Sequence, residues 1–365
     1  MSRIIKTELS MDVLTAAKAR IKNVFDSAPK VYLSFSGGKD SIVLSDIVYK
    51  MCLSMQVDRR KLVVEFIDEE AIFPCVEKVV MEWREKWRKL GVEFRWWCIE
   101  VKHFSCLNSL TQEETFICWD STKKGKWIRD KPKGCISDHP WLKKRKDKYQ
   151  DFLQRIEKDG ISIVGIRTAE SVQRVQNMAV RLTYGNQEKV FPIYDMTDSD
   201  VWYYILQNDL NIPDAYLYMW QIGRPKNRLR ISQFFSVDTI GSLSEMAQYY
   251  PELFTRICDR EPNAYMTMLY YDTELFRRAK KETDNVDYRK KFFEYINSEA
   301  AREQMKVRPK EFSNAFRLAQ NVYMSDKTWK MLYNSIVGGD PKSRTYRAIM
   351  TEVQCQRKRL SEKSR

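Results

Sequence analysis

Short apolar runs alternate with amphipathic stretches over the first two thirds of the chain. The runs are rich in Val, Ile, Phe and Trp and predict buried strands at residues 31–35, 61–68, 92–99 and 161–164. The stretches with apolar side chains at helical spacing are residues 10–28, 42–51 and 76–90. This alternation predicts an α/β fold with a doubly wound, mostly parallel sheet.

The pattern changes in two places. Residues 103–148 break the alternation and are predicted to form an insertion. From about residue 241 only helical spacing remains, with predicted helices at residues 265–279, 288–301, 312–323 and 329–337. Gly338 and Gly339 are expected to end the last of these helices. We therefore predict an α/β domain over residues 1–240 and a helical C-terminal domain over residues 241–365.

The most specific local pattern is Ser36-Gly-Gly-Lys-Asp-Ser41, between the first predicted strand and a helix. Its two glycines allow the backbone to approach an anion closely, and the helix N-terminus favours negative charge. Lys39 adds a mobile cation, and Asp40 or Ser41 is placed to cap the helix. The pattern predicts a phosphate-binding turn, although its spacing is neither that of a Walker A loop nor that of a dinucleotide-binding turn.

Other residues are placed to complete this site. Asp68 opens an acidic cluster, Asp68-Glu69-Glu70, at the carboxyl end of a predicted strand, where open α/β sheets bind ligands. The alternative is that these acids only begin the helix that follows. After the strand at 161–164 come Gly165 and Arg167, with Arg174 one to two helical turns further on. Guanidinium groups suit the geometry of phosphate and neutralise its charge.

The Ser36 to Ser41 pattern resembles the PP-loop of the ATP pyrophosphatase superfamily, whose members bind ATP and split it between the α- and β-phosphates. Gly165-x-Arg-x-x-Glu-Ser followed by Arg174, and the Asp-Val-Trp of residues 191–205, resemble the phosphoadenosine-phosphosulfate-reductase-like branch. In overall layout the chain is most similar to the IbrA-like proteins of that branch. The resemblance covers the first two thirds of the chain and implies an adenine nucleotide alpha hydrolase-like fold there.

This resemblance implies ATP and Mg²⁺ as cofactors, with Asp40 as a metal ligand. Attack on the α-phosphorus would give an adenylylated acceptor and pyrophosphate. The predicted catalytic residues are Lys39, Asp40, Arg167 and Arg174. The predicted nucleotide-binding residues are Ser34, Ser36, Gly37, Gly38, Lys39, Asp40, Ser41, Asp68, Gly165, Arg167 and Glu170.

The net charge of +14 is unevenly distributed along the chain. Residues 119–150 hold eleven Lys and Arg against four Asp, and residues 341–365 hold eight against two Glu. Such clustering predicts a polyanionic partner such as nucleic acid, and a solvated basic face with a basic tail is the alternative. Trp119, Trp127 and Trp141 lie among the first group of cations. They would either stack on bases or anchor the insertion to the core.

The eight cysteines form no Cys-x-x-Cys pair, which favours reduced thiols. The insertion holds both histidines and three cysteines, but their spacing matches no zinc or iron–sulfur pattern, so we expect no such cluster. No apolar run is long enough to span a membrane and no signal-peptide core is evident, so we expect a cytoplasmic protein with no membrane contact.

Three functions remain open. The first is an ATP-splitting enzyme that adenylylates an acceptor. The second is a regulator that senses adenine nucleotide without turnover and binds nucleic acid or a protein, and the IbrA-like resemblance implies a ParB-like partner. The third, sulfonucleotide reduction, is disfavoured because the family's Glu-Cys-Gly-x-His pattern is missing around Cys258 and Cys355.

Overall fold

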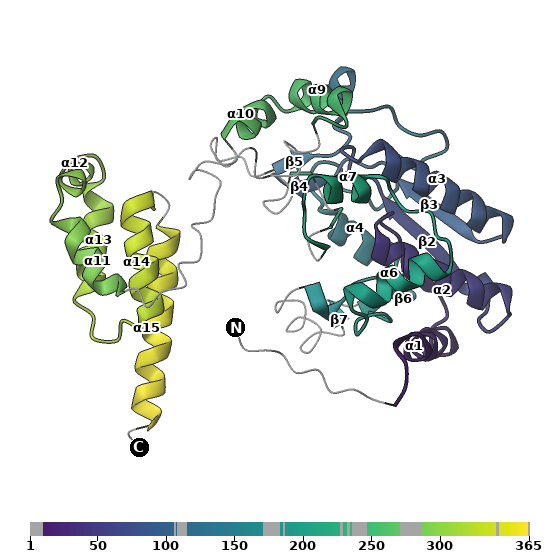
Figure 1. Cartoon of the computed structure of the whole chain (residues 1–365), viewed down its shortest axis with the longest axis horizontal. Helices are drawn as coiled ribbons and strands as arrows, with labels where there is room; N and C mark the ends of the chain where they lie inside the picture. The colour runs from purple at the N-terminus through teal and green to yellow at the C-terminus, as the bar shows by residue number, and fades with distance from the viewer. Residues whose placement is uncertain are drawn as a thin grey trace. The chain divides into compact units, whose positions relative to one another are not determined.

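The structure is a computed structural model. It describes residues 10–105, 107, 115–170, 183–184, 187–226, 229–231, 234–235, 247–270, 287–340 and 343–363. The chain divides into two compact units, Met1–Arg277 and Arg278–Arg365 (Figure 1). The division therefore lies beyond the boundary predicted at residue 240. The reason is helix α9 (Pro251–Arg260), because its Leu253 and Ile257 are buried in the core of the first unit.

The first unit is built on a six-stranded sheet with the order β3-β2-β1-β6-β8-β7. The strands are β1 (Val31–Ser34), β2 (Leu62–Ile67), β3 (Glu93–Trp97), β6 (Ile161–Val164), β7 (Thr183–Tyr184) and β8 (Gln187–Val190). Strand β1 pairs in parallel with both β2 and β6, and only the edge strand β7 is antiparallel to its neighbour. The predicted, mostly parallel sheet is confirmed.

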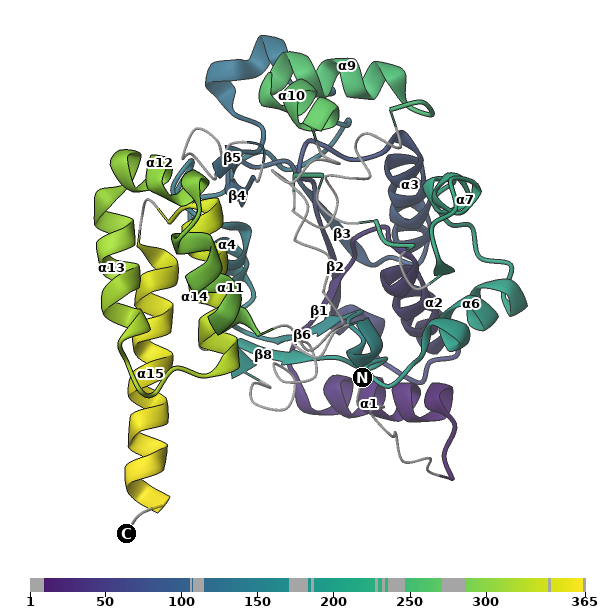
Figure 2. The same cartoon turned by 60° about the vertical axis from the view of Figure 1, so that its left-hand side comes forward.

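Helices lie on both faces of this sheet, with α2 and α3 on one side and α4 on the other (Figure 2). On the first face the ring of Phe35 lies 5.9 Å from that of Trp83 in α3, and on the second the ring of Trp97 lies 5.1 Å from that of Phe152 in α4. The doubly wound α/β class is therefore confirmed. Together with α9, the helices described in this unit are α1 (Val13–Ser27), α2 (Lys39–Leu53), η1 (Arg59–Lys61), α3 (Pro74–Lys89), α4 (Tyr149–Ile156), η4 (Thr168–Glu170), α6 (Asp198–Gln207), α7 (Ala215–Gln221) and α10 (Asn263–Tyr270).

The predicted insertion contains a small antiparallel pair, β4 (Lys102–Phe104) and β5 (Thr115–Ile117), followed by the 3₁₀ helix η3 (Ser121–Lys126). Trp119 is fully buried, and its indole N–H donates to the carbonyl oxygen of Asp68 at 2.7 Å. Trp127 packs edge-on against Trp119. These two tryptophans anchor the insertion to the core, whereas the side chain of Trp141 is 47% exposed.

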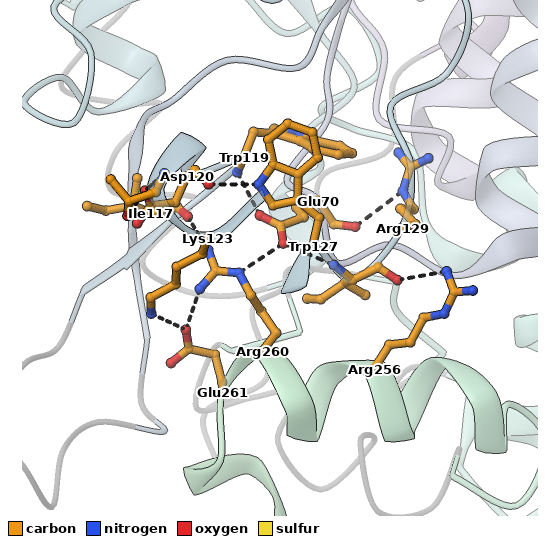
Figure 3. A network of polar contacts seen from close by, with 12 residues as sticks. Glu70, Ile117, Trp119, Asp120, Lys123, Trp127, Arg129, Arg256, Arg260 and Glu261 are labelled. Atoms are coloured by element: carbon orange, nitrogen blue, oxygen red, sulfur yellow. Dashed lines mark hydrogen bonds and ion pairs between the residues drawn. The ribbon is translucent and has the colours of Figure 1, made fainter. Parts of the chain in front are cut away.

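A buried polar network joins the insertion, the acidic cluster and α9 (Figure 3). The carboxylate of Glu70 accepts from the amides of Trp119 and Ile128 and pairs with Nε of Arg260 at 3.1 Å. Burial raises the pKa of Glu70, although Arg260 and these amides oppose the shift. Because α3 begins only at Pro74, the alternative in which these acids start that helix is wrong.

The second unit is helical, as predicted, and has its own core. The predicted helix 288–301 is divided in two, because the hydroxyl of Ser298 caps a new helix by accepting from the amide of Ala301. Gly339, with φ +87°, ends α14 as expected. The helices are α11 (Tyr288–Ile296), α12 (Glu299–Val307), α13 (Pro309–Ala319), α14 (Asp326–Gly338) and α15 (Arg344–Lys363).

Helix α15 carries most of the basic C-terminal segment, for which the hydrophobic pattern predicted no helix. Of the predicted helix 265–279, residues 265–270 lie in α10 and the rest fall outside the described residues. Across the described parts of both units, no helix is long and apolar enough to cross a bilayer.

Removing Arg260 tests the buried network. Arg260→Ala leaves the buried carboxylate of Glu70 without its cation, so we expect the free energy of unfolding to fall by about 3–5 kcal/mol. Urea unfolding followed by tryptophan fluorescence reports on the first unit, which holds every tryptophan except Trp329. Arg256→Ala on the same helix is the control, because that side chain is exposed and only reaches the carbonyl of Ile128 at 3.5 Å. Equal losses from the two variants would contradict a stabilising role for the Glu70 pair.

Candidate functional site

The predicted phosphate-binding turn lies at the point where the strand order reverses. From β1, strands β2 and β3 extend the sheet on one side, while β6 and β8 extend it on the other. Loops that leave adjacent parallel strands in opposite directions open a crevice, and α/β proteins bind ligands there. In this chain the crevice lies between the loop after β1 and the loop after β6.

The turn after β1 depends on its glycines. Gly37 has φ +70°, and a Cβ atom there would lie 2.9 Å from Cγ1 of Val76. Gly38 is the N-cap of α2 and has no side chain to cap it, so the expectation that Asp40 or Ser41 caps the helix is wrong. A helix N-terminus presents its amides and positive dipole end to an anion.

Two serine hydroxyl groups hold the turn together. The hydroxyl of Ser41 accepts from the amide of Ser36 at 3.2 Å and donates to the carbonyl of Gly38 at 2.9 Å. The hydroxyl of Ser36 lies 3.0 Å from that of Ser41. These contacts fix the backbone of the turn.

A cleft of about 260 Å³ opens over this turn. The structure brings seven of the predicted residues to its wall, namely Ser34, Ser36, Gly38, Lys39, Asp40, Ser41 and Gly165. It also places Tyr216, Arg230 and Ile231 there, which were absent from the predicted site. In the sequence Arg230 lies close to Arg224, Lys226 and Arg228, and a cluster of cations alone is a weak signal for a site.

Gly165 lets the end of β6 meet the first turn of α2. A Cβ atom at this position would lie 3.1 Å from the carbonyl carbon and oxygen of Asp40 and 3.2 Å from Cα of Ser41. These are backbone atoms, which cannot move aside as the end of a flexible side chain can. A side chain at this position would therefore push the two loops apart by a few tenths of an ångström, and glycine avoids that cost.

Arg167 holds Asp40 in place from behind the cleft wall. Its side chain is only 1% exposed, its Nε lies 2.8 Å from Oδ1 of Asp40, and a second nitrogen lies 2.8 Å from Oδ1 of Asp198. Burial would lower the pKa of Arg167, but the two carboxylates outweigh burial and raise it. The ammonium of Lys39 lies 3.5 Å from the other oxygen of Asp40.

Protein groups occupy the hydrogen-bond donors of Lys39. Its backbone amide donates to the hydroxyl of Tyr216 at 2.9 Å, and its ammonium donates to the carbonyl of Leu229 at 3.2 Å. The side chain of Lys39 is 3% exposed. Burial lowers its pKa, and Asp40 partly offsets the shift. A phosphate bound at the backbone amide would have to replace the Tyr216 hydroxyl, and one that took the same N–H of the ammonium would replace the Leu229 carbonyl.

The other predicted residues lie elsewhere or are not described. Asp68 is buried away from the cleft lining, where its carboxylate accepts from the indole of Trp96 and pairs with Arg129. Glu170 ends the 3₁₀ helix η4, and Arg174 falls outside the described residues. Nucleotide contacts by these three remain predictions. Among the described residues, no three His, Cys, Asp or Glu side chains gather as metal ligands would.

Comparison with known families places one domain within the first unit. Residues 117–224 match the phosphoadenosine phosphosulfate reductase domain, a stretch that includes Gly165 and Arg167. The chain is 26% identical over 280 residues to "Uncharacterized protein YbdN" of Escherichia coli (strain K12), across 70% of this chain and 67% of that protein.

Solved structures with partial likeness include U34-tRNA thiolase NcsA from Methanococcus maripaludis with its [4Fe-4S] cluster. The two chains are 10% identical, with a TM-score of 0.34, and the match covers 71% of this chain and 79% of that one. Another is FMN adenylyltransferase from Candida glabrata, at 17% identity and a TM-score of 0.35, covering 59% of this chain and 63% of that one. A third is phosphoadenylyl-sulfate reductase from Candida auris, at 15% identity and a TM-score of 0.33, covering 63% of this chain and 99% of that one. Likeness of this degree says nothing about substrate.

Replacing Tyr216 by Phe tests whether its hydroxyl competes with phosphate. Without the hydroxyl, the amide of Lys39 has no protein acceptor in this contact, so we expect ATP to bind about two- to tenfold more tightly, since one hydrogen bond contributes about 0.5–1.5 kcal/mol. Isothermal titration calorimetry measures the change. Tyr218→Phe on the same helix is the matched control, because Tyr218 instead stacks on Tyr249. Weaker ATP binding by Tyr216→Phe would show that the hydroxyl assists the nucleotide.

Proposed function

We propose that this protein binds ATP with its phosphates in the 260 Å³ cleft and transfers the adenylyl group to an acceptor, releasing pyrophosphate. The observation that carries the proposal is the convergence of Ser36, Lys39 and Gly165 on the N-terminus of α2, whose N-cap is a glycine. A helix N-terminus beside a lysine and two glycine turns suits a polyphosphate.

The contacts of Lys39 suggest how the phosphates enter. Phosphate oxygens would replace the hydroxyl of Tyr216 at the amide and the carbonyl of Leu229 at the ammonium. Both donors are then aimed at anionic oxygens in a site shielded from water, where their electrostatic effect is strengthened. Charge that develops on the leaving pyrophosphate is stabilised by groups already in position.

Asp40 is the residue that would hold magnesium. Its carboxylate lines the cleft, and Mg²⁺ favours one or two carboxylates together with phosphate oxygens and water. When bound, the ion would neutralise phosphate charge. In this arrangement Arg167 is a positioning residue, since it fixes Asp40 through Nε and ties it to Asp198.

The charge distribution of the chain bears on the acceptor. The basic segments 119–150 and 341–365 make nucleic acid a candidate, because clustered cations favour a polyanion. The ParB-like partner and the cytoplasmic location inferred from the sequence remain predictions.

A second candidate function is nucleotide sensing without turnover. It is supported by the contacts that Tyr216 and Leu229 make with Lys39, since a nucleotide that displaces them would move segments far from the phosphate-binding turn. Sulfonucleotide reduction lacks this kind of support. Burial raises the pKa of the Cys258 thiol, which disfavours the thiolate, and Cys355 lies on α15 without the reductase pattern around it.

Pyrophosphate release from ATP labelled at the α-phosphorus, with Mg²⁺, tests the proposed reaction. We expect Lys39→Ala and Asp40→Ala each to lower the rate about 100-fold, because each removes charge that acts on the transition state. Lys50→Ala is the matched control, since Lys50 lies on the same helix but is exposed and pairs with Asp46. The assay is run with and without RNA or DNA to identify an acceptor. Tight ATP binding with no release under any condition would favour the sensor instead.

A further inference from the structure

A second cleft, of about 460 Å³, lies on the sheet face that carries α4. Its volume is in the range of small-molecule sites, and its walls combine aromatic rings with a few charged groups as such sites do. The residues that matter most here are Lys30, Tyr32, Trp97, His139, Trp141 and Lys158.

This cleft and the phosphate cleft share one strand. Tyr32 lines the second cleft and Ser34 lines the first, and both lie on β1. Residues two apart on a strand project from the same face and lie about 7 Å apart. The two clefts have no lining residue in common, so the second cleft is a separate site beside the first.

Aromatic side chains form much of the wall. The ring of His139 meets that of Trp97 edge-on at 5.9 Å and that of Trp141 at 5.5 Å. Trp141 differs from the buried Trp119 and Trp127 of the same insertion because nearly half of its side chain is exposed. An exposed indole at the mouth of a cleft offers a flat surface for stacking.

Charged groups of both signs line the cleft beside this aromatic surface, with three cations (Lys30, Arg95 and Lys158) and two carboxylates (Glu93 and Asp159). The ammonium of Lys158 lies 5.1 Å from the ring centroid of Trp141, and that of Lys30 lies 3.8 Å from Asp159. The basic run Lys143-Lys-Arg-Lys146 follows within a few residues. Lys144 and Arg145 pair with acids, but within the described residues Lys143 and Lys146 are exposed and make no ion pair.

We propose that this second cleft binds a nucleobase together with its adjoining phosphate. The base stacks on Trp141 against the aromatic wall, and Lys158 and Lys30 attract the phosphate. The ligand is either a free mononucleotide or a single-stranded nucleic acid whose backbone continues over Lys143 and Lys146. The inference extends the proposed function, in which nucleic acid is a candidate acceptor, but binding here requires no cleavage of ATP.

Fluorescence anisotropy of a labelled oligouridylate of about eight nucleotides tests this site, because a single-strand site covers about 4–16 nucleotides. The probe contains no adenine and no triphosphate, and the assay omits ATP. We expect Trp141→Ala to weaken binding at least about fivefold, since each stacked base contributes that much or more. Trp220→Ala is the matched control, because Trp220 is 66% exposed on α7 and is absent from the cleft. Circular dichroism checks that both variants fold.

Competition with uridine monophosphate distinguishes the two sources of ligand. Displacement of the oligonucleotide at comparable concentration assigns the site to a mononucleotide, and Trp141-dependent binding that the monophosphate does not displace assigns it to a strand. The proposal is overturned if the wild type binds neither probe. It is also overturned if Trp141→Ala binds as tightly as Trp220→Ala while Lys143→Gln and Lys146→Gln weaken binding. A protein that releases no pyrophosphate yet binds through Trp141 would refute only the proposed reaction.

Discussion

The contact between the end of β6 and the first turn of α2 sets the geometry of the phosphate cleft. It is a contact of backbone with backbone, since Gly165 faces the carbonyl of Asp40 and Cα of Ser41. No side chain lies between these segments to absorb a change in spacing, so their separation is fixed by the parallel pairing of β1 with β6. Arg167 follows two residues later and reaches Asp40 because of that spacing. The position of the carboxylate is thus a consequence of sheet register.

Much of this arrangement was predictable from local sequence. Buried parallel strands are continuous apolar runs, and a glycine pair before a helix marks a turn that approaches an anion, so the sheet and the Ser36 to Ser41 turn were predicted. The cap of α2 was predicted wrongly, because Asp and Ser are common caps but here Ser41 bonds within the turn instead. Tyr216 was missed because its contact with Lys39 spans 177 residues of chain and depends on tertiary packing.

Hydrophobic periodicity was least informative about which core a helix joins. The spacing of Leu253 and Ile257 shows that α9 has an apolar face, but it does not show which core that face contacts. The buried pair of Glu70 and Arg260, separated by 190 residues, belongs to the first unit and was invisible to patterns of a few residues. Trp119 and Trp141 likewise share the same basic surroundings in sequence, and only burial separates an anchoring residue from an exposed one.

Strand β1 is four residues long, and one of its faces contributes Tyr32 to the second cleft and Ser34 to the phosphate cleft. A central strand held on both sides moves as a unit, because its ladder hydrogen bonds resist independent displacement of neighbouring residues. A ligand that displaced β1 from one cleft would therefore move a wall of the other, and thermodynamic reciprocity would require any resulting change in affinity to be the same in both directions.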